Sequence, residues 1–287
     1  ARDVDRLLDA LERIDVSPLG AGALAGSSLP LDPDYTARRL GFAGRFENSL
    51  DAVGSRDHVA EALFALTLVG INLSRMGEEF VLWTSEEFGF ATLDDGYATG
   101  SSMLPQKKNP DIAELARGKA GRLIGDLTGF LATMKGLPLA YNRDYQEDKE
   151  PLFDAVDQIS LALSAIRGMV ATATWVPERM QSAADSETGS ATDLAEWLVQ
   201  RGTPFRDAHA IVGLLVRRHL AGEGTLRSLV AADPALGADA AALVAPGVAV
   251  QRRTTAGGAG PAAVAVQLER FRSRLAELRA AVTAGVR

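Results

Sequence analysis

The segment from Asp57 to about Trp83 places the tightest limit on the fold, because its apolar residues recur at steps of three and four. Those residues are Val59, Leu63, Leu66, Val69, Leu73, Met76 and Phe80. This spacing predicts one long amphipathic helix with a single buried face. Gly70 and Gly77 lie on or beside that face, where each weakens a helix by about 1 kcal/mol relative to alanine. We therefore expect both glycines to mark close contact with a neighbouring helix.

Two further long helices are predicted in the same half of the chain. The first starts at about Pro110. The backbone amide at the first position of a helix has no partner within the helix, so proline, which has no backbone N–H, is well suited to that position. The second follows the turn at residues 136–138. Their apolar stripes are formed by Ile112, Leu115, Ala116, Leu123, Leu127 and Leu131, and by Phe153, Val156, Ile159, Leu163, Ile166 and Val170. Long helices with short connections favour a bundle, and no convincing strand pattern is found. The expected fold class is therefore all-α.

The character of the sequence changes near residues 175–177, beyond which Gly, Pro and Ala become denser and the predicted helices shorter. We expect residues 1–182 to form a central helical-bundle domain and residues 183–287 a small C-terminal helical domain. The helices predicted in the second domain run from Asp193 to Arg201, from Pro204 to His219, and from about Pro261 onward.

Composition excludes several classes of function. The net charge of −7 over 287 residues argues against binding to nucleic acid or a membrane surface, since both need a broad basic face. The chain has no cysteine, so disulfides and thiolate chemistry are excluded. Three histidines without HExxH-type spacing predict no metal site. No uninterrupted apolar run reaches the roughly 18 to 20 residues that cross a bilayer. The first residues are already periodic, so we expect the chain to begin inside an element of a longer protein.

The segment from Thr99 to Asp111 concentrates polar chemistry. Two hydroxyls, two ammonium groups and two side-chain amides lie within nine residues, and the segment leads into the start of a predicted helix. A helix N-terminus has unpaired backbone amides and a positive dipole end, which suits a carboxylate or a phosphate. On composition alone, a solvated connection between helices is the competing interpretation.

The ordered string from Gly100 to Asn109, GSSMLPQKKN, resembles the GSSxMPxKxN signature of the superfamily that contains fumarase, aspartase and argininosuccinate lyase. Its apolar pair is transposed, since superfamily members usually carry methionine directly before the proline. The two side chains have similar volumes, so we expect little consequence. The double lysine and the segment Leu139 to Pro151 resemble the argininosuccinate lyase family in particular. The resemblance covers at least residues 1–220 and includes residues 17–26, 48–52 and 191–198.

The resemblance implies an anti β-elimination that converts argininosuccinate to arginine and fumarate without a cofactor. It assigns proton abstraction to Ser101, whose alkoxide would be stabilised by Lys107 and by the following helix N-terminus. It gives Asn109 a hydrogen bond to the substrate carboxylate. It pairs Glu114 with an acid histidine from another subunit, although a solvated helix charge is the competing interpretation for that residue alone.

The same resemblance implies that Tyr141, Gln146 and Lys149 bind the substrate through hydrogen bonds and charge. It also implies a cytoplasmic enzyme of arginine biosynthesis, a homotetramer whose active sites are shared between subunits. Members of the family begin with a further region that carries the acid histidine, so we expect the chain by itself to be inactive if that region is absent.

Two other functions are open at this stage. One is a different lyase of the superfamily that releases fumarate from another succinyl adduct, and the other is a non-catalytic structural protein like the lens crystallins related to the family. His58, His209 and His219 do not match the family's catalytic histidine, and we expect them to be structural.

Overall fold

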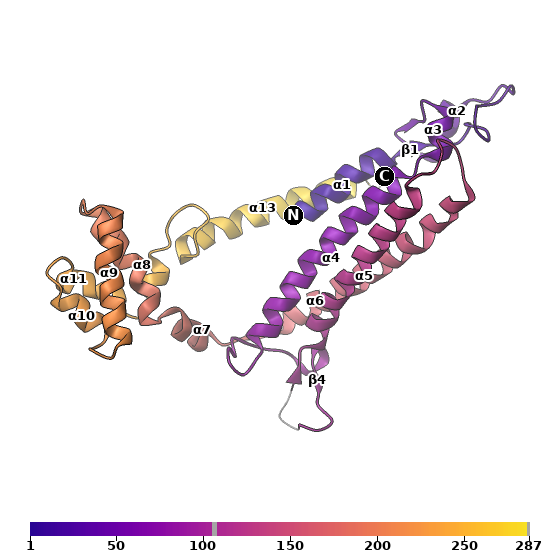
Figure 1. Cartoon of the computed structure of the whole chain (residues 1–287). Helices are drawn as coiled ribbons and strands as arrows, with labels where there is room; N and C mark the ends of the chain where they lie inside the picture. Colours follow the sequence, from indigo (N-terminus) through magenta and orange to yellow (C-terminus); the bar gives the residue numbers. More distant parts are fainter. Residues whose placement is uncertain (105–107, 286–287) are drawn as a thin grey trace. The chain divides into compact units, whose positions relative to one another are not determined.

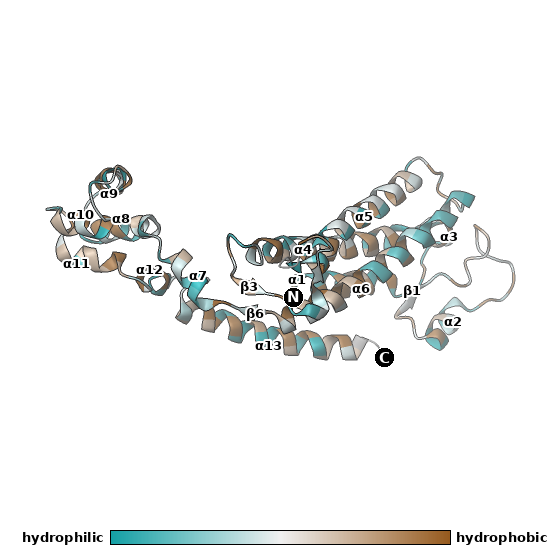
Figure 2. Ribbon diagram, turned by 90° about the horizontal axis from the view of Figure 1, so that it is seen from below, coloured by the Kyte–Doolittle hydropathy of each residue, from teal (hydrophilic) through white to brown (hydrophobic). Residues whose placement is uncertain are grey.

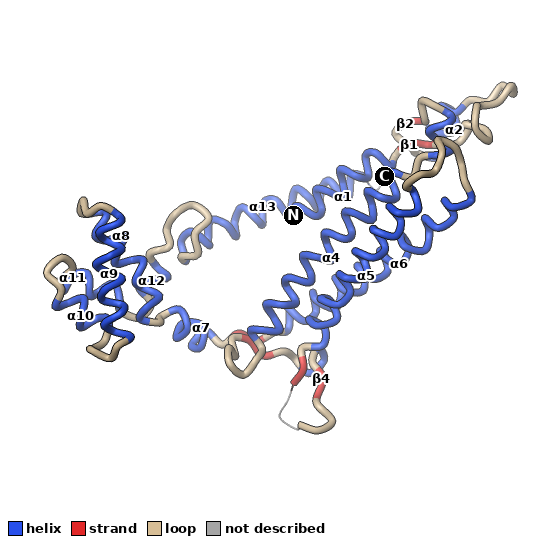
Figure 3. Tube along the Cα trace, viewed as in Figure 1, coloured by secondary structure: helices blue, strands red, loops and turns tan. Residues whose placement is uncertain are grey.

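The computed structural model describes residues 1–104 and 108–285, most of which lie in helices (Figure 3). The all-α prediction is confirmed, because each strand in the described part of the chain is only two residues long. The strands are β1 (Val16–Ser17), β2 (Gly44–Arg45), β3 (Ala91–Thr92), β4 (Thr99–Gly100), β5 (Lys108–Asn109) and β6 (Thr174–Trp175). The chain forms two compact units, one of Ala1–Thr174 with Leu278–Arg287 and one of Trp175–Glu277.

Four long helices carry the first unit: α1 (Arg2–Ile14), α4 (Asp57–Trp83), α5 (Asp111–Met134) and α6 (Lys149–Thr172). The helix predicted from Asp57 to Trp83 is confirmed at both ends. It contacts the other three, most extensively α5, and α4, α5 and α6 run side by side (Figure 1). The shorter elements of this unit are α2 (Pro33–Leu40), α3 (Ser49–Gly54), η1 (Asp95–Tyr97) and η2 (Arg143–Asp148).

The core of the first unit uses only part of each apolar stripe that the sequence shows. Its buried residues are Val59, Leu63, Val69, Leu73, Phe80, Leu93, Ala113, Ala116, Leu123, Phe130, Ala155, Ile159, Ile166 and Met169. Other members of the predicted stripes are exposed in the single chain, namely Met76, Leu115, Leu131, Phe153, Val156 and Leu163. Figure 2 shows apolar residues recurring along these helices. The helices therefore present apolar side chains beyond those that the chain itself buries.

Gly70 and Gly77 lie where α4 approaches α5. A Cβ atom at Gly70 would lie 2.3 Å from Cδ1 of Leu123, and one at Gly77 would lie 2.5 Å from the carbonyl oxygen of Ala113. Both distances are too short for real atoms, so the two helices approach closely only because these positions have no side chain. The prediction that both glycines serve packing is confirmed.

Gly77→Ala is expected to lower the free energy of unfolding by about 1 to 3 kcal/mol, the usual cost of overpacking a core. The new methyl group would meet backbone of α5, and backbone cannot rotate away as a side chain can. Thermal denaturation measures the change. Gly118→Ala is the matched control, because a Cβ there meets no atom of the chain within 4 Å. A Gly77→Ala protein as stable as the parent would contradict the close packing.

Helix α4 is the one helix among residues 1–104 and 108–285 that is long and apolar enough to cross a membrane by length and composition. Charged and polar residues interrupt its apolar positions, so it contains no continuous apolar run of that length. Buried residues recur along α4 from Val59 to Phe80, where it packs against its neighbouring helices. This is the environment of a core helix in a bundle.

The second unit has its own core of small helices. They are α7 (Pro177–Ala184), η3 (Glu187–Ser190), α8 (Ala191–Gln200), α9 (Phe205–Leu220), α10 (Leu226–Ala232), α11 (Gly237–Ala241), η4 (Ala242–Val244) and α12 (Val248–Gln251), followed by the long α13 (Pro261–Gly285). Asp193 is fully buried and its two carboxylate oxygens accept hydrogen bonds from Arg252 and Arg253, at 3.0 and 2.6 Å. The boundary that the sequence suggested after residue 182 falls inside α7, whereas the contacts divide the chain after Thr174 and return its last ten residues to the first unit.

Candidate active site

The polar loop found in the sequence leaves and re-enters the bundle through a short antiparallel ladder. Thr99 of β4 pairs with Asn109 of β5, and Gly100 pairs with Lys108. Asp111, the first residue of α5, accepts hydrogen bonds from the backbone amide of Thr99 at 3.1 Å and from its hydroxyl. Both ends of the loop are therefore fixed to each other and to the start of α5.

Ser101 follows this ladder directly. Its Oγ accepts hydrogen bonds from the backbone amides of Met103 and Leu104, at 3.2 and 3.0 Å. Two amide donors on one hydroxyl oxygen favour negative charge on that oxygen. Lys107, the predicted source of further positive charge, lies outside the described residues, as do Pro105 and Gln106.

A cavity of about 690 Å³ adjoins the loop. Asn109 and Glu114 line it together with Leu104 and Lys108, so two of the predicted catalytic residues share one cavity. The remaining lining residues come from the end of α4, from the segment that follows it and from the start of α5: Val81, Thr84, Ser85, Glu86, Glu87, Ala91, Thr92, Leu93, Ala98 and Pro110. Ser101 does not line this cavity.

Helix α5 begins one residue later than predicted. Pro110 has φ −81° and ψ 55°, which is not helical, so it is the N-cap and Asp111 is the first helical residue. Glu114 stands in the first turn, and its carboxylate lies 4.0 Å from Arg117 Nη2. Arg117 is bound more closely by Glu78, at 2.5 Å. Among the described residues, the carboxylate of Glu114 thus has only this distant ion pair.

The three residues predicted to bind substrate lie together near η2. Gln146 donates a hydrogen bond from Nε2 to the Tyr141 hydroxyl at 2.7 Å. Lys149, the first residue of α6, donates from Nζ to Asp148 Oδ1 at 2.8 Å. Asp148 in turn accepts a hydrogen bond from Arg56 at 2.8 Å. Sequence reasoning missed Arg56 and Asp148, since only the fold brings together residues 92 positions apart.

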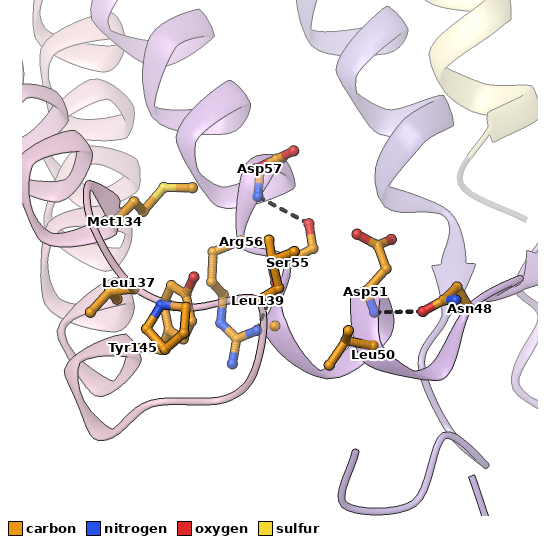
Figure 4. Close-up of a pocket in the computed structure, with 12 residues that line it drawn as sticks. Asn48, Leu50, Asp51, Ser55, Arg56, Asp57, Met134, Leu137, Leu139 and Tyr145 are labelled. Carbon is orange, nitrogen blue, oxygen red and sulfur yellow. Dashed lines mark hydrogen bonds between the residues drawn. The ribbon is translucent and has the colours of Figure 1, made fainter. Parts of the chain in front are cut away.

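A second cavity, of about 420 Å³, adjoins this group (Figure 4). Arg56 and Tyr145 line it, with polar side chains from the start of α3 and α4 and apolar ones from the connection between α5 and α6. These further residues are Asn48, Leu50, Asp51, Gly54, Ser55, Asp57, Met134, Leu137, Pro138 and Leu139.

The two groups of predicted residues lie at opposite ends of α5 (Figure 1). Ser101, Asn109 and Glu114 are at its N-terminus, whereas Tyr141, Gln146 and Lys149 follow its C-terminus. The helix has 24 residues and is therefore about 36 Å long. No side chain spans that distance, so one chain cannot apply both groups to the same small molecule.

Comparison with known proteins agrees with the motif. Residues 1–125 match the family described as Lyase, and residues 189–251 match the one described as Argininosuccinate lyase C-terminal. The argininosuccinate lyase of Frankia casuarinae is 55% identical over 283 residues, covering 97% of this chain. That of Kineococcus radiotolerans is 54% identical over 286 residues, covering 96%. The chain belongs to the argininosuccinate lyase family. It spans 60% of the length of both of these argininosuccinate lyases.

Solved structures place the family in its wider fold. EDDS lyase in complex with formate is 32% identical, with a TM-score of 0.90 over 99% of this chain and 60% of that one. The class II fumarase of Schistosoma mansoni has a TM-score of 0.72 at 16% identity, over 83% of this chain and 53% of that one, and so shares the fold. This chain therefore shares its helical fold with both of these proteins.

Proposed function

We propose that this chain is part of an argininosuccinate lyase, which breaks argininosuccinate into arginine and fumarate. The observation that carries the proposal is the Ser101 hydroxyl held under two backbone amides, inside a loop that bears the superfamily signature. Its relatives that are more than half identical share the name argininosuccinate lyase, which supports the substrate. We further propose a cytoplasmic enzyme of arginine biosynthesis.

The chemistry begins with a proton on the carbon next to a substrate carboxylate. We assign its removal to Ser101, acting as an alkoxide. A serine hydroxyl is a weak base unless its anion is stabilised. The amides of Met103 and Leu104 donate to that oxygen, and the N-terminus of α5 adds positive potential. We assign the remaining stabilisation to Lys107.

Negative charge then develops on the substrate carboxylate as the proton leaves. Asn109 lines the cavity beside the loop, and its amide group is assigned the hydrogen bond that stabilises this charge. The carbon–nitrogen bond breaks, its electron pair goes to the guanidino nitrogen, and the carbon–carbon double bond of fumarate forms. An acid protonates the departing nitrogen. We assign to Glu114 the orientation of that acid, a histidine from another subunit.

Substrate binding is assigned to Tyr141, Gln146 and Lys149. The phenol and the amide offer hydrogen bonds to polar groups, and the ammonium group offers charge to a carboxylate. Because this group lies a full length of α5 away from Ser101, a complete site requires the loop of one copy and the segment around residues 141–149 of another.

A homotetramer with shared sites satisfies this requirement. When two copies of α5 pack antiparallel about a two-fold axis, the N-terminus of one helix lies beside the C-terminus of the other. The exposed apolar side chains of α4, α5 and α6 support such packing, since they would be covered by the helices of other copies. These residues include Phe64, Met76, Leu115, Ile124, Leu131, Phe153, Val156 and Leu161.

A substrate panel tests the proposed function. The protein at its complete length is expected to release arginine and fumarate in equal amounts from argininosuccinate. We expect kcat/KM for other succinyl adducts to be at least about 100-fold lower. Preference for another adduct would reassign the substrate. Failure to cleave any adduct, in a well-folded protein, would favour the crystallin-like alternative.

A further inference from the structure

The ammonium group of Lys149, which is proposed to bind the substrate, is already bound by the carboxylate of the neighbouring Asp148. Asp148 is buried, and its side chain is only 10% exposed. Oδ1 accepts from Lys149 Nζ and Oδ2 from Arg56 Nε, both at 2.8 Å. One carboxylate thus joins two cations, one from the start of α4 and one from the start of α6.

Arg56 is held on several sides. It is the N-cap residue of α4 and its side chain is 18% exposed. Its Nη1 donates to the carbonyl oxygens of Ser55 and Val53, at 2.7 and 3.4 Å. Its guanidinium carbon lies 5.0 Å from the centre of the Tyr145 ring, within the range of a cation–π contact. Figure 4 shows Arg56 leading from the start of α4 toward Tyr145.

The charges of this group explain why Arg56 matters for Lys149. The pair of Asp148 and Lys149 alone would have no net charge, and the positive charge of the Lys149 ammonium group would be neutralised by the Asp148 carboxylate. Arg56 supplies a second positive charge, so the three side chains together carry one net positive charge. That surplus stands at Lys149, because its side chain is 53% exposed whereas Arg56 is mostly covered. Burial favours the neutral form of Asp148, but hydrogen bonds from Lys149 and Arg56 prevail and lower its pKa.

We infer that Arg56 is a positioning residue, which acts through Asp148 to hold the Lys149 ammonium group in one orientation while leaving its charge free for a substrate carboxylate. This inference rests on the proposed function. It gives Arg56 no contact with the reacting atoms, so its loss acts on substrate binding rather than on bond breaking.

A double-mutant cycle on the complete protein tests the inference. Arg56→Gln is expected to raise KM for argininosuccinate about tenfold, the scale of a charge-assisted hydrogen bond, with kcat nearly unchanged. In a Lys149→Ala background the same substitution is expected to change KM no further, because the group it positions is gone. Arg56→Lys keeps the charge but loses the planar fork, so KM rises only about threefold.

Arg13→Gln is the matched control, since Arg13 also pairs with two carboxylates, those of Asp9 and Glu61, at an exposed place on the same unit. It is expected to leave KM unchanged. If Arg56→Gln fails to fold, Asp148→Asn replaces it in the cycle, because it keeps the side-chain size and removes the shared charge.

Two results would overturn the inference. In one, the effects of Arg56→Gln and Lys149→Ala on KM multiply, so that the two residues act separately. In the other, Arg56→Gln lowers kcat and leaves KM unchanged. A parent protein that does not cleave argininosuccinate would instead refute the proposed function, and the inference with it.

Discussion

Ser101→Ala is expected to lower kcat for argininosuccinate by about 10⁴-fold, the upper end of what a general base contributes, with little change in KM. The proposed work of Ser101 occurs only as the carbon–hydrogen bond breaks, whereas Tyr141, Gln146 and Lys149 hold the substrate beforehand. Loss of a group that acts only in the transition state lowers kcat and spares substrate affinity. Steady-state kinetics on the complete protein measures both constants.

Ser102→Ala is the matched control for this substitution. Ser102 is exposed and neighbours Ser101 in the loop, but the two amide hydrogen bonds go to the Ser101 oxygen. The control is expected to retain most of the parental kcat. A Ser101→Ala protein that keeps more than about a tenth of parental kcat, well inside the general-base range, would show that Ser101 is not the base. The reverse pattern would move that role to Ser102.

Mixing two impaired proteins is expected to restore activity, because the two halves of the proposed site lie at opposite ends of α5. Ser101→Ala damages the loop end, and Lys149→Ala damages the substrate-binding end, where it weakens binding. In tetramers re-formed from an equal mixture, about a quarter of the sites combine an intact loop with an intact binding segment. The assay is turnover at a substrate concentration well below KM, before and after the subunits are exchanged.

Two variants that damage the same end provide the control for this mixture. Ser101→Ala and Asn109→Ala both lie in the loop, so every site in their hybrids has a damaged loop and no recovery is expected. If the first mixture also stays inactive after proven exchange of subunits, the shared site is refuted. If recovery appears in both mixtures, it does not report on which chain supplies which group.

The bundle was predictable from the sequence because a stripe of apolar residues at steps of three and four has few other uses. Helix α4 was placed correctly at both ends, and Gly77 was correctly assigned to packing. The same stripe could not show which apolar residues the chain buries by itself. Leu115 and Phe153 continue their stripes and yet are exposed. Apolar periodicity indicates which face of a helix is covered, but it does not indicate whether the same chain or another chain covers that face.

The candidate site was predictable only as far as ordered motifs reach. The loop string and the block around Lys149 named residues that the fold then grouped at two places, and their roles stay predictions. The pair of Arg56 and Asp148 left no signal, because a charge in a helical sequence looks the same whether solvent or a distant partner meets it. The sequence also could not show how far the loop residues lie from the residues around Lys149. That separation follows from the length of α5, whereas the family resemblance assigns both groups to one active site.

The ladder between β4 and β5, tied to Asp111, has a consequence for how such proteins diverge. Because β4 and β5 are bonded to each other, the two ends of the loop stay together whatever residues the loop carries between them. The transposed Met103 and Leu104 illustrate this, since Met103 is 85% exposed and contributes nothing to the core. Mutation can therefore explore new chemistry next to these strands while the bundle that supports them keeps its stability.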